Sequence, residues 1–156
     1  VQRKGDQIQQ ANIQSILKKK GYLTVFFGSW IGDKKPEGFD YWEILEDTSQ
    51  FYNPKLINPH RSRKIEGHTT DIIADIALAW LNKESKITKP IFMVVHFNGL
   101  QQPWIPPIRN LELYNDLLLP EPITLNASHD NKAPPSRYQE MQIETNLNVE
   151  SDLCPN

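Results

Sequence analysis

The clearest pattern of apolar and polar positions in this chain spans residues 70–82. Six apolar side chains recur there at the spacing of one helix face: Ile72, Ile73, Ile76, Ala77, Trp80 and Leu81. Thr69 or Thr70 can cap this segment, with Asp71 in the first turn. The spacing predicts an amphipathic helix over these residues.

Two other stretches are short, uninterrupted apolar runs instead. Residues 22–27 and 91–97 are rich in β-forming side chains, which is typical of strands buried on both faces. Residues 7–20 carry a weaker helical stripe of apolar side chains. The segment ends in three lysines and is followed by Gly21, as suits a helix C-terminus. Residues 29–59 show no sustained period, so we expect a long ordered loop there. This order predicts an α/β fold with a mostly parallel sheet and helices on its faces.

Two polar segments follow the two predicted strands. These are residues 28–30 and residues 98–101. Ligands bind at the carboxyl ends of the strands in such sheets, so we expect both segments to line one candidate pocket.

The last third of the chain is polar and rich in proline. Pro106 and Pro107 predict the start of a short helix. We expect residues 118–122 to be extended, residues 127–135 to form a loop, and residues 137–147 to form a last helix.

Charge and cysteine content exclude several classes of function. With a formal net charge of −2 over 156 residues, no electrostatic argument favours nucleic acid or an anionic membrane surface. The single cysteine, Cys154, excludes an internal disulfide framework and a multi-cysteine metal site. No apolar run approaches 18 residues, so we expect no membrane insertion. The His and acidic residues show no convincing metal-ligand spacing, and we predict no metal site.

A longer motif joins residue 28 to residue 42. It reads Gly-Ser-Trp-Ile at 28–31, then Pro36, then Gly-Phe-Asp-Tyr-Trp at 38–42. This resembles the sulfatase active-site loop, which reads Gly-Lys-Trp-His-Leu-Gly and then Pro-x-Gly-Phe-Asp-Tyr-Trp. Further segments resemble the same family in the same order. They are residues 50–54, residues 67–81, residues 89–104 and residues 117–122.

The resemblance runs from about residue 9 to about residue 153, and it is to bacterial sulfatases that act on polysaccharides. It implies part of an alkaline-phosphatase-like, three-layer α/β sandwich. It also implies an extracellular or periplasmic location and a sulfated glycan as a partner.

The family's chemistry needs groups that this chain does not carry at the matching places. The nucleophile is formylglycine made from Cys or Ser in Cys-x-Pro-Ser-Arg, and carboxylates and an amide hold a calcium ion. Both regions lie outside the part that matches. We therefore expect residues 1–156 to be a partial sulfatase-like domain that lacks the N-terminal nucleophile region and the C-terminal metal region, with no cofactor of its own.

Three family site positions inside the match hold other residues. Ser29 stands where the family has Lys and supplies no positive charge, while Ile31 stands for a His and has no donor or acceptor. Gln101 stands for the His that serves the leaving group, and an amide does not exchange protons near neutral pH. No residue of the chain is thus a credible catalytic group, and we expect no sulfate-ester hydrolysis by this chain alone.

Two other features have a functional and a structural interpretation. Residues 133–137, Ala-Pro-Pro-Ser-Arg, resemble the nucleophile motif, but Ala has no nucleophilic atom and the segment lies after the other motifs. We interpret it as an ordinary Pro-Pro turn. His96, near a predicted strand end, is either a pocket base or a hydrogen-bonded structural histidine, and we favour the second.

The rival hypothesis is a binding module for sulfated or acidic glycans. Arg61, Arg63 and Lys64 would supply charge-assisted contacts. The other candidate contacts are an aromatic and amide set: Trp30, Gln101, Gln102 and Trp104. A solvated basic loop and buried aromatics are the structural alternative, and a remnant or fragment of a longer sulfatase is a third possibility. Because the predicted strands are apolar on both faces, self-association is also expected.

Overall fold

The computed structural model describes residues 12–32, 35–83, 88–99, 102–118, 120–124 and 132–137, together with Asn146 and Asn148. The chain divides into two units, residues 1–100 and residues 101–156, and each is described by itself. All the strands of the described residues belong to the first unit.

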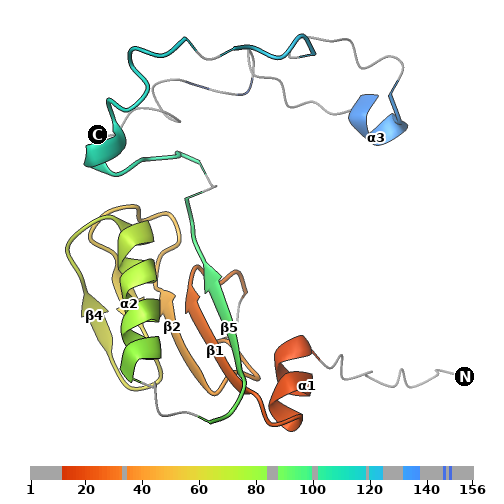
Figure 1. Ribbon diagram of the computed structural model, residues 1–156, viewed down its shortest axis with the longest axis vertical. Coiled ribbons are helices and arrows are strands. Elements are labelled where there is room, and N and C mark those ends of the chain that lie inside the picture. The colour runs from red at the N-terminus through yellow and green to blue at the C-terminus, as the bar shows by residue number, and fades with distance from the viewer. Residues whose placement is uncertain are drawn as a thin grey trace, which may run out of the picture. The chain divides into compact units, whose positions relative to one another are not determined.

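A five-stranded sheet forms the centre of the first unit, in the order β4-β3-β2-β1-β5 (Figure 1). β1 (Leu23–Gly28) runs parallel to both of its neighbours, β2 (Tyr41–Leu45) and β5 (Ile91–His96). β3 (Lys55–Ile57) and β4 (Ser62–Lys64) continue the sheet as an antiparallel hairpin. The predicted α/β fold is confirmed, with a sheet that is parallel on one side and antiparallel on the other.

The long loop predicted over residues 29–59 is wrong beyond its first part. β2 and β3 lie inside that range, and β4 follows it directly. β2 has five residues and follows a Gly-Phe-Asp turn, while β3 and β4 have three residues each, and those of β4 are all polar. Strands this short show no alternation that a sequence pattern can detect.

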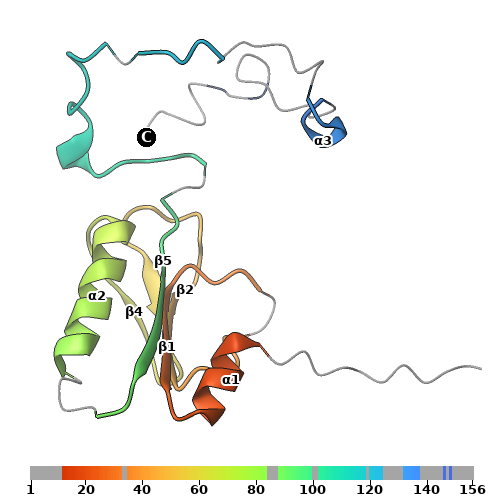
Figure 2. The same ribbon diagram turned by 45° about the vertical axis from the view of Figure 1, so that its right-hand side comes forward.

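Two helices lie on opposite sides of the sheet (Figure 2). α2 (Thr69–Lys83) confirms the helix predicted for residues 70–82. α1 (Ile13–Lys19) is shorter than the helix predicted for residues 7–20. Asn12 has an extended backbone and accepts a hydrogen bond from the N–H of Ser15, so it caps the helix and fixes its start at Ile13. Residues 7–11 of that prediction lie outside the described residues.

Each face of the sheet carries its own apolar core. On the α2 side, Val25 and Phe27 of β1 pack with Ile72, Ile73 and Ala77 of the helix. The opposite face carries a smaller core built on Phe26, Trp42 and Ile44. Alternation along β1 explains this division, since successive side chains of a strand point to opposite faces.

The second unit contains only short elements in its described residues. η1 (Ile108–Asn110) is a 3₁₀ helix capped by Pro107, which confirms a short helix after the proline pair. The described part of residues 118–122 is neither helix nor strand, as expected. α3 (Pro134–Arg137) begins inside the stretch predicted as a loop over residues 127–135. The helix predicted for residues 137–147 lies mostly outside the described residues.

Candidate functional site

The carboxyl ends of β1 and β5 meet at one edge of the sheet, as the sequence predicts. Gly28 lies opposite His96 in the parallel register. The N–H of Ser29 donates to the carbonyl oxygen of His96 at 2.8 Å, so the pairing continues past the end of β1. Leu100 and Gln101, which belong to the second predicted site segment, lie outside the described residues.

Gly28 allows these two strand ends to approach. Its φ of +106° is a conformation that favours glycine, and a Cβ atom there would lie 2.0 Å from the carbonyl oxygen of His96. No other residue fits without moving the backbone of β5. The backbone turn that starts the site loop therefore depends on the absence of a side chain at position 28.

His96 ties the start of the same loop to β5. Its Nδ1 lies 2.6 Å from the carbonyl oxygen of Ser29. Because a carbonyl oxygen only accepts, Nδ1 is the donor in this contact. The ring also meets Phe26 edge to face, with centroids 6.5 Å apart. These contacts give His96 the structural role that its sequence position favours.

The loop presents no ionisable side chain at its two substituted positions. Ser29 is completely buried, and its Oγ has no hydrogen-bond partner among the described residues. Ile31 is 73% exposed, an unusual position for a large aliphatic side chain. A buried hydroxyl and an exposed alkyl group do not hold a sulfate ester by charge.

The tryptophans of this region differ in their surroundings. Trp30 meets Phe26 edge to face at 5.1 Å and Phe39 at 6.4 Å, within the core opposite α2. Trp42 is buried in the same core. Trp104 and Gln102 belong to the second unit and are described only there. The aromatic contacts of Trp30 favour a role in holding the loop over the sheet.

The second half of the motif, residues 38–42, acts at the other end of β1. Asp40 Oδ2 accepts hydrogen bonds from the N–H and the hydroxyl of Thr24, at 2.9 and 3.0 Å. Lys18 Nζ lies 2.7 Å from Asp40 Oδ1, which ties α1 to the start of β2. Gly38 has a φ of +85°, and a Cβ there would lie 2.5 Å from Ser15 Oγ. The Gly-Phe-Asp segment is thus a structural joint between α1, β1 and β2.

These contacts also set the acidity of Asp40. Partial burial by itself raises the pKa of this carboxyl. The hydrogen bonds from Lys18 and Thr24, together with the positive charge of Lys18, outweigh burial and hold the pKa below its usual range. Asp40 therefore stays ionised at neutral pH.

Asn98 is a site residue whose role the sequence does not reveal. It is completely buried, and its Nδ2 donates to the carbonyl oxygens of Thr48 at 3.2 Å and Gln50 at 3.3 Å. The hydroxyl of Thr69, at the start of α2, donates to the same Gln50 oxygen at 2.7 Å. Asn98 therefore fixes the loop after β2 against the end of β5. The only signal in the sequence is its place directly after a strand.

The basic segment around β4 does not act as one cluster. Arg63 Nε lies 2.8 Å from Oε1 of Glu43, a carboxylate whose side chain is only 4% exposed. The hydroxyl of Tyr41 donates to the other oxygen of Glu43 at 3.1 Å. Burial, followed by the charge of Glu43, raises the pKa of Tyr41. Arg61 and Lys64 are exposed, whereas Arg63 is partly buried and is engaged by Glu43.

Metal-ligating side chains do not gather in the described residues. No three of the described His, Cys, Asp and Glu side chains lie close enough together to hold a metal ion. No cluster among the described residues fits the calcium ion that the family resemblance implies. Within the same residues, no helix combines the length and apolarity that crossing a membrane requires.

Comparison with known proteins shows which family this chain belongs to. A family model described as Sulfatase matches residues 2–107. The N-acetylglucosamine-6-O-sulfatase of Bacteroides thetaiotaomicron is 31% identical over 147 residues, covering 92% of this chain and 26% of the relative. The N-acetylglucosamine-6-sulfatase of Homo sapiens is 26% identical over 142 residues, covering 80% of this chain and 26% of the relative. The chain thus spans about a quarter of the length of these relatives.

Solved structures agree with this placement. BT4656, in complex with its substrate D-glucosamine-2-N,6-O-disulfate, matches with a TM-score of 0.77 and 31% identity, over 89% of this chain and 28% of that chain. Ps i-CgsB, in complex with k-i-k-neocarrahexaose, matches with a TM-score of 0.57 over 68% of this chain and 30% of that chain; at 15% identity it supports the fold alone. The fold is therefore that of the alkaline-phosphatase-like α/β proteins. Within that class, the chain belongs to the sulfatase family.

Proposed function

We propose that this chain is a sulfatase-family domain that does not hydrolyse sulfate esters by itself. The observation that carries the proposal is the pair of substituted positions after β1, where Ser29 is buried and Ile31 is an exposed alkyl group. Removing one positioned donor from an oxyanion site costs about 2.7–4 kcal/mol in activation free energy. Two such losses lower turnover by several orders of magnitude.

A sulfate-release assay on the purified chain tests this proposal. Suitable substrates are an aryl sulfate and 6-O-sulfated glucosamine, since two relatives are named for sulfatase activity on N-acetylglucosamine. We expect no release above a heat-inactivated control. Release that Gln101→Ala abolishes would contradict the proposal, because it would assign a catalytic role to the amide at position 101.

A double variant makes the assay sharper. Ser29→Lys with Ile31→His restores the family residue types at both positions, and we expect it to be inactive because neither a nucleophile nor a metal site returns with them. Sulfate release by this variant would show that the rest of the machinery is present in the chain. Circular dichroism has to confirm that the variant keeps the fold, since position 29 is buried.

Exposed cations favour a second candidate function, the binding of a sulfated or acidic glycan. Arg61 and Lys64 extend to solvent on and beside β4, whereas Arg63 is engaged by Glu43. Guanidinium and ammonium groups bind sulfate through charge-assisted contacts. Of the other candidate contacts predicted from the sequence, Trp30 packs in the core opposite α2, and Gln102 and Trp104 belong to the second unit, so the proposal rests on Arg61 and Lys64. The extracellular or periplasmic location expected from the family would expose the chain to such glycans.

Chromatography on heparin, compared with an uncharged matrix, tests the binding proposal. We expect retention that weakens as salt rises, because ions screen exposed charges. Arg61→Ala with Lys64→Ala should reduce retention, while Lys19→Ala with Lys20→Ala, which removes two exposed lysines at the end of α1, is the control for the loss of two positive charges. Equal retention on both matrices, or equal loss in the control, would exclude binding through this segment.

A further inference from the structure

Asn98 combines a reactive sequence with a buried position. Gly99 follows it directly, and no other asparagine of the 156-residue chain precedes a glycine. Asparagine before glycine loses its side-chain amide most readily, because glycine has no Cβ atom that would shield the backbone nitrogen. Asn98 is completely buried, whereas Gly99 is exposed. The contacts of the Asn98 side chain therefore decide whether this pair reacts.

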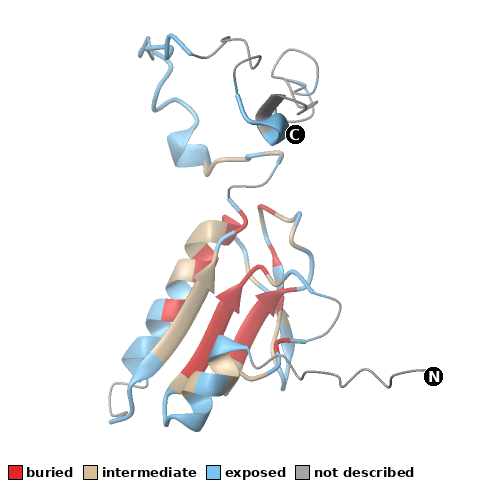
Figure 3. Ribbon diagram, turned by 90° about the vertical axis from the view of Figure 1, so that its right-hand side faces the viewer, coloured by how far each residue is buried: buried red, intermediate tan, exposed pale blue. Residues whose placement is uncertain are grey.

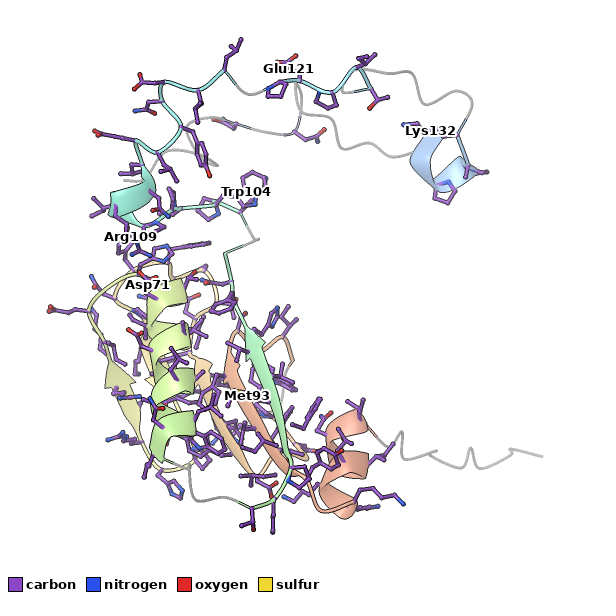
Figure 4. All side chains as sticks on the ribbon, viewed as in Figure 1. Asp71, Met93, Trp104, Arg109, Glu121 and Lys132 are labelled. Carbon is purple, nitrogen blue, oxygen red and sulfur yellow. The ribbon has the colours of Figure 1, made fainter. Side chains whose placement is uncertain are left out.

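The loop after β2 holds the side-chain amide of Asn98. Nδ2 donates to the carbonyl oxygens of Thr48 at 3.2 Å and Gln50 at 3.3 Å, and we call these two hydrogen bonds the Asn98 clamp. The hydroxyl of Thr69, the first residue of α2, donates to the same Gln50 oxygen. Figure 3 shows buried residues at the carboxyl ends of the strands and at the start of α2, and Asp71 is labelled near that start in Figure 4. The whole clamp lies in the first unit, so additional polypeptide would bury Asn98 further and would not expose it.

Only one end of this amide has hydrogen-bond partners. Asn98 Oδ1 has none among the described residues. A buried acceptor without a donor is unfavourable, so the favourable polar contacts of this side chain are those made by Nδ2. Loss of the nitrogen would remove both of them.

We propose that Asn98 is a deamidation site whose reaction releases the loop after β2 from the end of β5. The backbone N–H of Gly99 gives up its proton, and the nitrogen forms a bond to Cγ of Asn98, which closes a five-membered succinimide ring. The bond from Cγ to Nδ2 breaks, and Nδ2 leaves as ammonia. Water, the one co-reactant, then opens the ring and gives aspartate or isoaspartate at position 98. The site goes beyond the proposed function and does not depend on glycan binding.

The folded structure opposes the first step. The Gly99 nitrogen bonds to Cγ only when the side chain swings toward its own backbone, and Nδ2 then leaves the oxygens of Thr48 and Gln50. The reaction therefore needs a local opening between this loop and β5. Its rate in the folded chain equals the rate in the unfolded chain multiplied by the fraction of molecules that are open.

The product does not re-form the clamp. A carboxylate only accepts hydrogen bonds, and Thr48 and Gln50 present carbonyl oxygens, which also only accept. A negative charge is also costly at a completely buried position. Isoaspartate in addition routes the backbone through Cγ, which lengthens the link between residues 98 and 99. Deamidation thus loosens the carboxyl edge of the sheet irreversibly, next to the candidate site loops.

Deamidation kinetics in the folded chain and in the chain unfolded by guanidinium chloride test the proposal. Peptide mass spectrometry follows Asn98, and Asn110, which precedes Leu111, is the internal control that should react slowly in both states. We expect Asn98 to react at least about tenfold faster in the unfolded chain. Gly99→Ala should slow that reaction and keep the fold, since its Cβ would meet Thr70 Oγ1 at 3.5 Å, an ordinary contact. Equal rates in both states, or no reaction at Asn98 in the unfolded chain, would overturn the proposal.

Hydrogen exchange tests the release of the loop. We expect Asn98→Asp to raise the exchange rate of the amides of residues 46–51 at least about tenfold over the parent chain, and Gly99→Ala to leave it unchanged. If Asn98→Asp does not fold, the parent chain is compared before and after ageing, with the deamidated molecules resolved by mass. Unchanged exchange in the folded variant, or in the deamidated molecules, would show that the clamp does not hold this loop and would overturn the inference.

Discussion

β1 and β4 belong to one sheet but are held by different forces. Five of the six residues of β1 are buried, and the strand contributes to both apolar cores. None of the three residues of β4 is buried. Its side-chain anchor is Arg63, which reaches the buried carboxylate of Glu43 on β2. The centre of the sheet is thus fixed by packing, whereas its outermost strand, β4, is fixed by polar contacts.

This difference distinguishes the loops at the carboxyl ends of β1 and β5 from the hairpin that carries the candidate glycan contacts. The loops at the carboxyl edge start from β1 and β5, where a backbone shift disturbs two cores at once. The candidate glycan contacts on β4 lie on a short hairpin, where a substitution has mostly local consequences. Substitutions in the two regions should therefore differ in the size and the kind of their effects, and the largest effect is expected at the end of β1.

Gly28→Ala should cause the greatest loss of stability. The new methyl group would lie 2.0 Å from the backbone oxygen of His96, at a φ of +106° that L-residues rarely adopt. The clash and the strained φ both disturb the backbone where β1 pairs with β5. We therefore expect a loss of about 4 kcal/mol or more in the free energy of unfolding, or failure to fold. Urea unfolding measures it. Gly21→Ala is the control, because its φ is also positive but no atom lies within 4 Å; equal losses in both would refute the close-approach explanation.

Arg63→Ala and Arg61→Ala should differ clearly, although the two residues are neighbours on the hairpin. Removing Arg63 leaves the Glu43 carboxylate buried without its cationic partner, while the Tyr41 hydroxyl still donates to it. Breaking a buried ion pair costs about 3–5 kcal/mol, and the partial exposure of Arg63 reduces our expectation to about 2–3 kcal/mol. Arg61 is exposed and its loss should be within about 0.5 kcal/mol. Equal effects in thermal unfolding would contradict the polar anchor.

The sequence predicts the long apolar elements of this fold better than its short strands, and even β2, which is mostly buried, lies in the predicted loop. α2 and β5 are found within about one residue of their bounds, because long apolar periods and runs record burial directly. β3 and β4 are missed because each has only three residues, too few to show a period, and the side-chain anchor of β4 is a pair, Arg63 and Glu43, that lies 20 residues apart.

Some features of the candidate site can also be predicted from the sequence, and others cannot. Its location at the ends of β1 and β5 follows from strand order, and the loss of charge at Ser29 and Ile31 follows from residue type alone. The clamp made by His96 and the one made by Asn98 depend on distances between segments 67 and 50 residues apart. No period or spacing in one sequence records such contacts.

Asp40→Asn should give a smaller loss that depends on pH. At neutral pH the ionised carboxylate accepts bonds from Lys18 and Thr24, and we expect the variant to lose about 1–2 kcal/mol of unfolding free energy. The pKa of Asp40 is lowered in the folded chain, so this contribution is present above the ordinary Asp value of about 3.9 and disappears as the pH falls through the lower folded pKa. Urea unfolding at pH 7 and near pH 3 should show the two proteins converging in acid. A constant difference would mean that the charge is not responsible.

Lys55→Ala should have the smallest effect, although its ion pair is as short as that of Arg63. Lys55 Nζ lies 2.8 Å from Glu46 Oε1, but both side chains are 47% exposed, and exposed pairs contribute about 0–1 kcal/mol. Lys55 also lies directly opposite Lys64 in the β3-β4 register, so its removal relieves a repulsion between like charges. We therefore expect a change below about 0.5 kcal/mol, measured by urea unfolding at low and high salt. A loss of unfolding free energy above about 1 kcal/mol at low salt that vanished at high salt would contradict this expectation. It would show that the exposed Lys55–Glu46 pair stabilises the hairpin about as much as the Arg63–Glu43 pair does.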